Sequence, residues 1–332
     1  MATNRRDLLK NSLGLPLALA ALPAGASLGF AQEQYPTRTV TMVVPFPAGG
    51  SADMAGRPVA AALAEKFGRN VVVENKGGAG GGVGHAFVAR AEPDGHTLLM
   101  TLPSLAVIPE ANRLLGQPVQ YEFDQFAPIA RVFADAVILT VKKSSPWKTL
   151  DDFVQDVRKN PGQIPYGSSG KFGTVHLAME MFLNAAGLKM QHVPYQGGAP
   201  AFNALLSDQV PIIPSLESIA KGHLESGDVR VLAQWGTERL PSFKDAPTLQ
   251  EAGFKDVVYV LWAGLFAPRA TPERVQKVLR DAIRGYMQDP AVQQRFLKAG
   301  SQPGYLDAPE FAAFLKDDTA RLLSVVRKVG LT

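Results

Sequence analysis

Strand-like and helix-like segments alternate along most of this chain, and the alternation limits the possible folds more than any other feature. The apolar stretch Val40 to Val44 predicts a strand, about Asp53 to Phe67 has helical spacing, and Asn70 to Glu74 predicts a second strand. A helix from Ala86 to Ala91 and a strand from Thr97 to Thr101 complete a βαβαβ unit. Because parallel strands need crossover helices between them, we predict an α/β fold with parallel sheets.

A second unit of similar design follows. The stretch from Phe126 to Val141 holds two strand-like pieces, Pro128 to Phe133 and Ala136 to Val141, and it is a candidate crossing between two domains. Beyond it, extended and helical patterns alternate again. We expect helices at Asp151 to Lys159, with Thr149 as its cap, Thr174 to Ala186 and Ala201 to Leu206, and strands at Ile164 to Tyr166, Gln191 to Tyr195, Val210 to Ile213 and Val229 to Gln234.

The last part of the chain has no complete unit of its own. Val257 to Ala267 predicts a strand, and Pro272 to Tyr286 and Pro309 to Val329 predict helices. We expect these helices to return to the first domain, which makes that domain discontinuous. The predicted lobe 1 is residues 35–134 plus 255–332, and the predicted lobe 2 is residues 135–254. Two lobes joined by several crossing segments can close on a ligand like a clamp.

The first strand ends in a loop that is suited to holding a ligand. After Pro45-Phe46-Pro47 the chain reads Ala48-Gly49-Gly50-Ser51, and a helical pattern follows. Glycine lets bound atoms approach the backbone, and unpaired amides at a helix start attract anions, so the loop is either a simple turn or a site for a carboxylate or phosphate. Asp53 either caps the amides after it or contacts a cationic group on a ligand. Pro58 removes a helix hydrogen bond, so the helix either begins near Arg57 or is kinked at Pro58.

The N-terminus carries the pattern of an export signal. Asn4-Arg5-Arg6-Asp7-Leu8-Leu9-Lys10 is a twin-arginine pattern, and a weakly apolar run from Leu13 to Phe30 follows it. Glycine and proline interrupt this run, so it would make a poor membrane-spanning helix. Small residues at Gly29-Phe30-Ala31 predict cleavage near Ala31. We therefore expect residues 1–31 to be a twin-arginine signal and the mature protein to work in the periplasm.

Composition and charge fit a freely diffusing exported protein. The absence of cysteine suits an oxidising compartment and leaves no cysteine for lipid attachment after the signal. The net charge is +4, and residues 1–31 carry +2 of it, so the remaining +2 does not indicate a nucleic-acid partner. About 300 residues remain, enough for two domains that each have a core. We expect a monomer.

The sequence offers little support for a cofactor. None of the histidines shows metal-ligand spacing, and no cysteine can assist them. The glycine-rich stretch Gly77 to Gly84 fails both the dinucleotide pattern and the P-loop pattern, so we interpret it as a tight turn beside a ligand cleft. His176 and Glu180 are one helical turn apart and can pair, while His192 fits a hydrogen-bonded core residue. We expect neither a metal nor another cofactor.

One motif leaves an enzymatic alternative open. Ser168-Ser169-Gly170-Lys171 satisfies S-x-x-K, a signature of serine acyl-enzymes, and an exported location suits such an activity. The K-T-G and S-D-N elements that accompany this motif are absent from the sequence, and the serine precedes its helix in a glycine turn. The alternative function is therefore an exported serine hydrolase that uses Ser168 and Lys171. Our first interpretation is that the protein is not an enzyme and that Ser168, Ser169 and Thr174 act as hydroxyl donors.

A series of short motifs, in order along nearly the whole mature chain, points to one family. The motifs are Tyr35-Pro36, Val43 to Gly50, Val73-Glu74-Asn75, Pro93 to Leu99, Gly167 to Gly170, Thr174, His176-Leu177, His192 to Pro200, Ala246-Pro247-Thr248 and Glu251-Ala252-Gly253. Together they resemble the substrate-binding proteins of tripartite tricarboxylate transporters, the Bug family. The resemblance covers both predicted lobes.

This resemblance implies a two-lobed periplasmic binding protein fold, type II-like, in which each lobe is a mainly parallel sheet flanked by helices. Two loops, Phe46 to Asp53 and Gly167 to Thr174, would grip a ligand carboxylate between them through amides, hydroxyls and water. The glycine-rich stretch and the turn after Tyr195 would line the rest of the cleft, and the ligand would be delivered to the membrane components of a tripartite tricarboxylate-type transporter. The implied ligand-binding residues are Phe46, Pro47, Ala48, Gly49, Gly50, Ser51, Asp53, Gly82, Ser104, Ser168, Ser169, Gly170, Phe172, Thr174 and Tyr195.

The chain departs from the family pattern at four positions. Pro211 and Ser215 stand where members usually carry acidic residues, Gly82 replaces the usual asparagine, and Phe172 replaces a small residue. A ligand ammonium in a dry cleft needs an anionic partner, so the loss of two carboxylates argues against an amino acid.

The same positions bear on the expected ligand. Phe46 and Phe172, together with Leu216, favour an aromatic or otherwise apolar acid, although Asp53 and Glu217 remain able to serve a cation. A surface or scaffold protein without any ligand is a third possibility. The expected partners are thus a small carboxylate and the membrane components of the transporter, with no nucleic acid.

Overall fold

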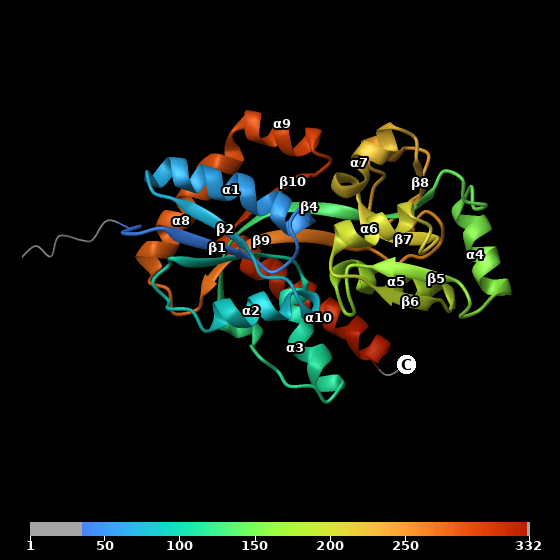
Figure 1. Ribbon diagram of the computed structural model, residues 1–332, viewed down its shortest axis with the longest axis horizontal. Coiled ribbons are helices and arrows are strands. Elements are labelled where there is room, and N and C mark those ends of the chain that lie inside the picture. Colours follow the sequence, from blue (N-terminus) through green and yellow to red (C-terminus); the bar gives the residue numbers. More distant parts are fainter. Residues whose placement is uncertain (1–34, 331–332) are drawn as a thin grey trace, which may run out of the picture. The chain divides into compact units, whose positions relative to one another are not determined.

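Two long strands run side by side through the middle of the fold (Figure 1). They are β4 (Phe126–Lys142) and β9 (Val260–Pro268), which pair antiparallel. The computed structural model describes residues 35–330, so the predicted export signal lies outside the described residues. The two strand pieces predicted between Phe126 and Val141 are one strand, whose pairing with β9 shifts register near Pro128 and near Arg131.

One half of β4 belongs to a six-strand path in the order β10-β4-β9-β3-β1-β2. Here β1 (Val40–Val44) pairs parallel with β2 (Val71–Asn75) and with β3 (Thr97–Thr101), which confirms the parallel pairing predicted for the βαβαβ unit. β9 joins β3 antiparallel, and β10 (Pro303–Asp307) joins β4 antiparallel. The sheet is therefore mixed. We call this part, with the helices that cover it, lobe 1.

The other half of β4 pairs antiparallel with β7 (Ile212–Leu216) and β8 (Val229–Gln234). A separate parallel pair is formed by β5 (Pro165–Ser168) and β6 (Gln191–Pro194). We call the part built on β5 to β8 lobe 2. β4 thus runs from one lobe into the other, as expected of a crossing segment, and the exact residue boundaries of the lobes stay a prediction.

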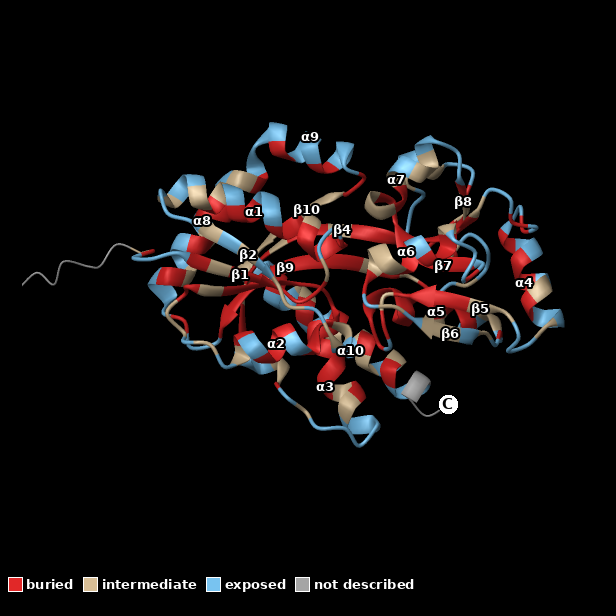
Figure 2. Ribbon diagram, viewed as in Figure 1, coloured by how far each residue is buried: buried red, intermediate tan, exposed pale blue. Residues whose placement is uncertain are grey.

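Helices cover the sheets, with their buried faces turned inward (Figure 2). Thr149 caps α4 as predicted, because its Oγ1 accepts a hydrogen bond from Asp152 N at 3.1 Å. Sequence patterns did not predict α3, α7 or α9; Pro109 lies inside α3 and Gly222 lies inside α7. The helices are α1 (Ser51–Phe67), α2 (Gly82–Ala89), α3 (Ser104–Leu114), α4 (Leu150–Lys159), α5 (Thr174–Ala186), α6 (Gly198–Leu206), α7 (Glu217–Glu225), α8 (Glu273–Gln288), α9 (Pro290–Lys298) and α10 (Ala308–Gly330), and the short 3-10 helices are Ala79–Gly81, Phe123–Gln125 and Pro241–Phe243.

The first helix starts directly at the glycine loop. α1 begins at Ser51, so the alternative start near Arg57 is wrong, and Pro58 lies within the helix. Gly56, one turn into the helix, approaches the sheet closely, since a Cβ there would lie 3.0 Å from Val44 Cγ2. The start of α1 is thereby placed over the end of β1.

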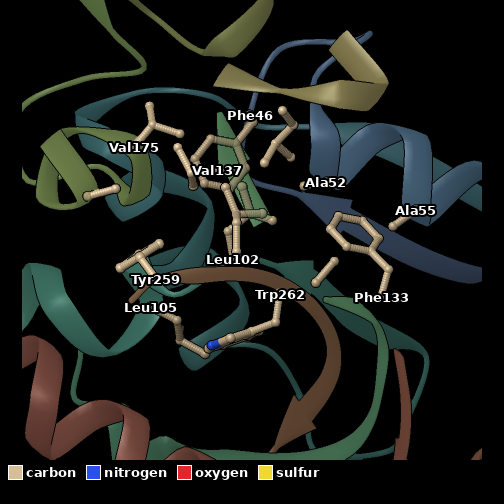
Figure 3. Packing of buried hydrophobic residues seen from close by; sticks show 14 of the residues in the cluster. Phe46, Ala52, Ala55, Leu102, Leu105, Phe133, Val137, Val175, Tyr259 and Trp262 are labelled. Atoms are coloured by element: carbon tan, nitrogen blue, oxygen red, sulfur yellow. The ribbon is translucent and has the colours of Figure 1, made fainter. Parts of the chain in front are cut away.

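The C-terminal helices pack mainly on elements of lobe 1. α8 packs against α1, and α10 packs against α3 and β4 but also touches α5 of lobe 2. Trp262 of β9 holds α10 in place, because its Nε1 donates to Asp318 Oδ2 at 2.8 Å and its ring meets Phe311 edge-on. Figure 3 shows Trp262 in the cluster of buried side chains near Leu105 and Tyr259.

This packing predicts that Gly264→Ala destabilises the protein. A Cβ at Gly264 would lie 2.5 Å from Phe311 Cζ, so the buried Phe311 ring must shift, at a cost of about 1–3 kcal/mol in the free energy of unfolding. Gly285→Ala on α8 is the matched control, because a Cβ there meets nothing within 4 Å and alanine favours a helix by about 1 kcal/mol. Urea unfolding measures both, and equal stability of the two variants would contradict the packing role of Gly264.

Candidate functional site

The N-terminal ends of three helices line one cavity between the lobes. Ser51 comes from α1 and Gly50 directly precedes it, Thr174 and Val175 come from α5, and Gly198 and Ala199 come from α6. The N-cap residues are Gly50, Gly173 and Gly197, and none supplies a capping side chain. Because the first amides of a helix lack intrahelical partners, these ends present unpaired donors and positive partial charge.

A fourth helix, α7, contributes Ile219 to the same wall, but its N-terminus differs. Glu217 occupies its first turn and offsets the positive end of the helix. Glu217 Oε1 accepts a hydrogen bond from Ser242 Oγ at 2.6 Å. The attraction for an anion therefore comes mainly from α1, α5 and α6.

The cavity is small and its wall is mostly apolar. Its volume is about 30 Å³. Hydroxyl groups are supplied by Ser51, Ser169, Thr174 and Ser215. Phe46, Leu102 and Val175 belong to one buried cluster (Figure 3). The remaining apolar wall residues are Pro47, Pro200, Ala201, Pro214, Leu216, Ile219 and Leu261.

A hydrogen-bond network fixes the loop before α1. Asp53 Oδ2 accepts from Gly49 N at 2.9 Å and from Arg57 Nε at 2.8 Å, and its Oδ1 accepts from Asn75 Nδ2 at 2.9 Å. Asn75 Nδ2 also donates to Phe46 O at 2.9 Å. Burial alone would raise the pKa of Asp53, but hydrogen bonds from Arg57, Gly49 and Asn75 outweigh it and hold the pKa below its usual value. The prediction that Asp53 caps the amides after it is wrong, because its carboxylate turns back to the loop.

The loop before α5 is held from beneath. Ser168 is fully buried, and its Oγ lies 2.6 Å from His192 Nε2. The predicted hydrogen-bonded role of His192 is thereby confirmed. Phe172 is also buried, and its N donates to His176 Nδ1 at 3.0 Å. His176 Nε2 lies 3.8 Å from Glu180 Oε1, so the predicted pair is present in a loose form.

A second cavity of about 180 Å³ adjoins the first and shares Phe46, Pro47 and Ser169 with it. Its other lining residues are Pro45, Gly78, Ala79, Gly80, Gly81, Gly170, Lys171, Pro194, Tyr195 and Gln196. The loops of the two lobes touch here, because a Cβ at Gly197 would lie 3.1 Å from Pro47 Cδ. The glycine-rich stretch and the turn after Tyr195 thus border the cleft, as the resemblance implied.

The structure brings eight of the predicted ligand-binding residues to these two cavities. Phe46, Pro47, Gly50, Ser51, Ser169 and Thr174 line the first, and Gly170 and Tyr195 line the second. The other predicted residues are outside both linings as described for residues 35–330: Ala48, Gly49, Asp53, Gly82, Ser104, Ser168 and Phe172. Contact with a ligand stays a prediction for all of them.

Two of these residues begin helices beside the glycine-rich stretch. Gly82 starts α2 and is buried. A Cβ added at Gly82 would lie 3.6 Å from Ile108 Cγ2, which is an ordinary contact. Ser104 starts α3, and its buried Oγ has no hydrogen-bond partner among the described residues. Leu102, Val175, Ile219 and Leu261 line the first cavity without having been predicted, because an apolar residue at the end of a strand or helix looks the same in sequence whether it faces a core or a cavity.

Three basic side chains could act as counter-ions for an acid, and each contacts another residue of the protein. Arg57 pairs with Asp53, and Arg239 Nε pairs with Glu251 Oε2 at 2.7 Å. Lys171 Nζ lies 5.5 Å from the ring centre of Phe172. Ser168 contacts His192 and the main chain of Gly170, so the S-x-x-K pattern does not present an accessible nucleophile.

Two further features are absent from residues 35–330. No group of three acidic, histidine or cysteine side chains is placed to hold a metal ion there. In the same part of the chain, none of the helices is long and apolar enough to span a bilayer.

Known proteins match this chain over most of its length. Residues 55–331 match a family described as tripartite tricarboxylate transporter family receptor. A UPF0065 protein in the gbd 5' region of Cupriavidus necator is 30% identical over 315 residues, which cover 95% of this chain and 93% of the relative. The periplasmic binding protein BugD is 32% identical with a TM-score of 0.81, covering 89% of this chain and 99% of BugD.

A second solved structure, R. palustris Rpa4515 with adipate, is 30% identical with a TM-score of 0.83, covering 89% of this chain and 98% of that protein. The fold is therefore the two-lobed α/β fold of periplasmic binding proteins.

Proposed function

Because this chain belongs to the tripartite tricarboxylate transporter receptor family and is a solute-binding protein, we propose that it captures a small organic carboxylate between the starts of α1 and α5. The twin-arginine signal directs export and is cleaved near Ala31, and the mature monomer works in the periplasm without catalysing a reaction. It delivers the acid to the membrane components of its transporter.

The observation that carries this proposal is the convergence of glycine-capped helix starts on one cavity. Gly50 and Gly173 are N-cap residues without a capping side chain, so the first amides of α1 and α5 lack a capping partner beside this cavity. Ser51, Ser169 and Thr174 add hydroxyl donors on the same wall. Each charge-assisted hydrogen bond to a carboxylate contributes about 1.5–3 kcal/mol, so a few of them suffice for micromolar binding.

The rest of the wall supports an acid with an aromatic or otherwise apolar body. Leu216, Ile219 and Leu261 lie where the body of such an acid would pack. The two carboxylates considered for a ligand ammonium are occupied, Asp53 by Gly49, Arg57 and Asn75, and Glu217 by Ser242. An amino acid would therefore leave its charge unpaired in a dry cleft, which is costly.

Calorimetry at pH 7 tests this function with benzoate, isovalerate, adipate and alanine. We expect benzoate or isovalerate to bind with micromolar Kd, and adipate and alanine to bind at least about tenfold more weakly, a difference of about 1.4 kcal/mol. A ligand at about 100 times its Kd should also raise the free energy of unfolding by about 2.7 kcal/mol. Tighter binding of alanine would contradict the apolar-acid proposal, and no binding by any acid would contradict the function.

A further inference from the structure

Two stacked histidines lie under the loop before α5: His176 contacts its main chain at Phe172, and His192 contacts the side chain of Ser168. We propose that His176 is a positioning residue that sets the shape of the loop Gly167 to Thr174 by holding the backbone of Phe172. The inference deepens the proposed function, because this loop carries Ser169 and leads into α5. His176 holds the backbone of Phe172 in the ligand-free protein, so this role can be tested without a ligand.

The backbone of Phe172 has a conformation that needs support. Its φ is +56°, in the left-handed region that side chains rarely adopt, and the residue is buried. Its N donates to His176 Nδ1 at 3.0 Å, and the two rings meet edge-on with centres 5.9 Å apart. Both the amide and the side chain of Phe172 are thus held by one buried histidine.

This hydrogen bond requires one particular protonation state of His176. Because Phe172 N donates, Nδ1 must carry a lone pair, so the ring is neutral with its proton on Nε2. Burial lowers the pKa of His176 well below its usual value, and the nearby charges of His192 and Lys171 lower it further. Nε2 faces Glu180 at 3.8 Å, and Glu180 accepts a hydrogen bond from Tyr166.

The second histidine, His192, supports the same loop at Gly170, two residues before Phe172, through the side chain of Ser168. His192 stacks on His176 with ring centres 4.0 Å apart, and its Nε2 lies 2.6 Å from Ser168 Oγ. Ser168 Oγ accepts a hydrogen bond from Gly170 N at 3.3 Å and lies 3.2 Å from Gly170 O. The main chain is therefore held at Gly170 and at Phe172, on either side of Lys171.

Because the main chain is held at Gly170 and Phe172, the position of Ser169 beside the cavities is also restrained. Ser169 lines both cavities, while Ser168 and Phe172, its neighbours in the loop, are turned inward and buried. Tyr166 stacks on both histidine rings, with centres 6.4 Å from His176 and 5.1 Å from His192, so strand β5 also restrains the pair. Loss of the His176 acceptor should free the loop at Phe172 without removing a group that lines either cavity.

Two variants separate the hydrogen bond from the packing. His176→Asn keeps an acceptor oxygen at the place of Nδ1, whereas His176→Phe keeps a ring and removes the acceptor. In the ligand-free protein, amide hydrogen exchange at Phe172 should be at least tenfold faster in His176→Phe and close to wild type in His176→Asn. His223→Phe, a change at an exposed histidine of α7, is the control and should leave exchange at Phe172 unchanged.

Ring ¹⁵N NMR of the wild-type protein at pH 6.5 provides a second readout that does not depend on any variant folding. We expect His176 to be neutral with an unprotonated Nδ1. A proton on Nδ1, or unchanged Phe172 exchange in a folded His176→Phe, would overturn the proposal.

Binding of benzoate links the positioning to function. We expect His176→Phe to weaken benzoate binding at least tenfold and His176→Asn to restore most of it. If His176→Phe binds benzoate with wild-type affinity, the proposed link between the shape of the loop and ligand binding is overturned. If wild-type protein binds neither benzoate nor isovalerate, the proposed class of apolar acids fails, whereas the exchange and NMR measurements still decide whether His176 positions the loop.

Discussion

Replacing Gly50 by valine should abolish carboxylate binding and leave the fold intact. Gly50 lines the first cavity at the start of α1, so the added methyl groups would fill the approach to the helix amides. Its φ of −81° and ψ of 170° suit a β-branched residue, and a Cβ there meets only Pro47 O at 3.5 Å, an ordinary contact. Losing two charge-assisted hydrogen bonds of about 1.5–3 kcal/mol each corresponds to at least about a 100-fold rise in Kd.

Calorimetry with the tightest acid of the panel measures this effect, and thermal unfolding checks the fold. Gly285→Val, on the exposed side of α8 with nothing within 4 Å of a Cβ, is the matched control and should bind like wild type. Gly49 is a poorer choice for the test, because its φ of +80° would strain any side chain. Wild-type affinity in Gly50→Val would mean that the loop is only a turn.

The second large effect expected is a stability change with pH that disappears in Asp135→Asn. Asp135 lies on β4 next to the point where the strand leaves β9 for β7. Its Oδ2 accepts from Ser301 Oγ at 2.9 Å and its Oδ1 from Gln302 N at 2.6 Å, both in lobe 1. Glu217 of lobe 2 packs against the neighbouring Gly300, where a Cβ would lie 3.0 Å from Glu217 Cγ.

Burial raises the pKa of Asp135 to about 7, the hydrogen bonds from Gln302 and Ser301 oppose this only in part, and the charge of Glu217 adds to it. The folded protein therefore binds more protons than the unfolded chain between about pH 4 and pH 7, so stability falls as the pH rises through this window. A shift of about three pKa units corresponds to up to about 4 kcal/mol. Asp135→Asn should match wild type near pH 4 and be more stable at pH 8.

Urea unfolding at several pH values measures this difference. Asp307→Asn is a control of opposite sign, because hydrogen bonds from Arg280 and Arg284 hold the pKa of Asp307 below its usual value. That variant should lose stability at pH 8, where wild type keeps the charged pair, and the difference should shrink as the pH falls. If Asp135→Asn follows the wild-type curve at every pH, the buried carboxyl does not carry this dependence.

Local chemistry made much of this fold predictable. The alternation from Val40 to Thr101 predicted the parallel strands β1, β2 and β3, because apolar runs and glycine turns act over a few residues. Thr149 as a cap followed from its place before an acidic first turn. The antiparallel partners of β4 were not predicted, since their pairing joins segments more than 70 residues apart in sequence, which no local pattern encodes.

The sequence alone determined that two glycine loops precede helices and that the chain resembles a carboxylate receptor family. Tertiary structure decided which groups face the cleft. Ser168 and Ser169 are adjacent and chemically identical, yet Ser168 is buried against His192 while Ser169 lines both cavities, because neighbouring side chains along an extended chain point to opposite sides. Asp53 likewise does not cap the amides after it but supports Gly49, because Arg57 and Asn75 meet it only when α1 and β2 pack together.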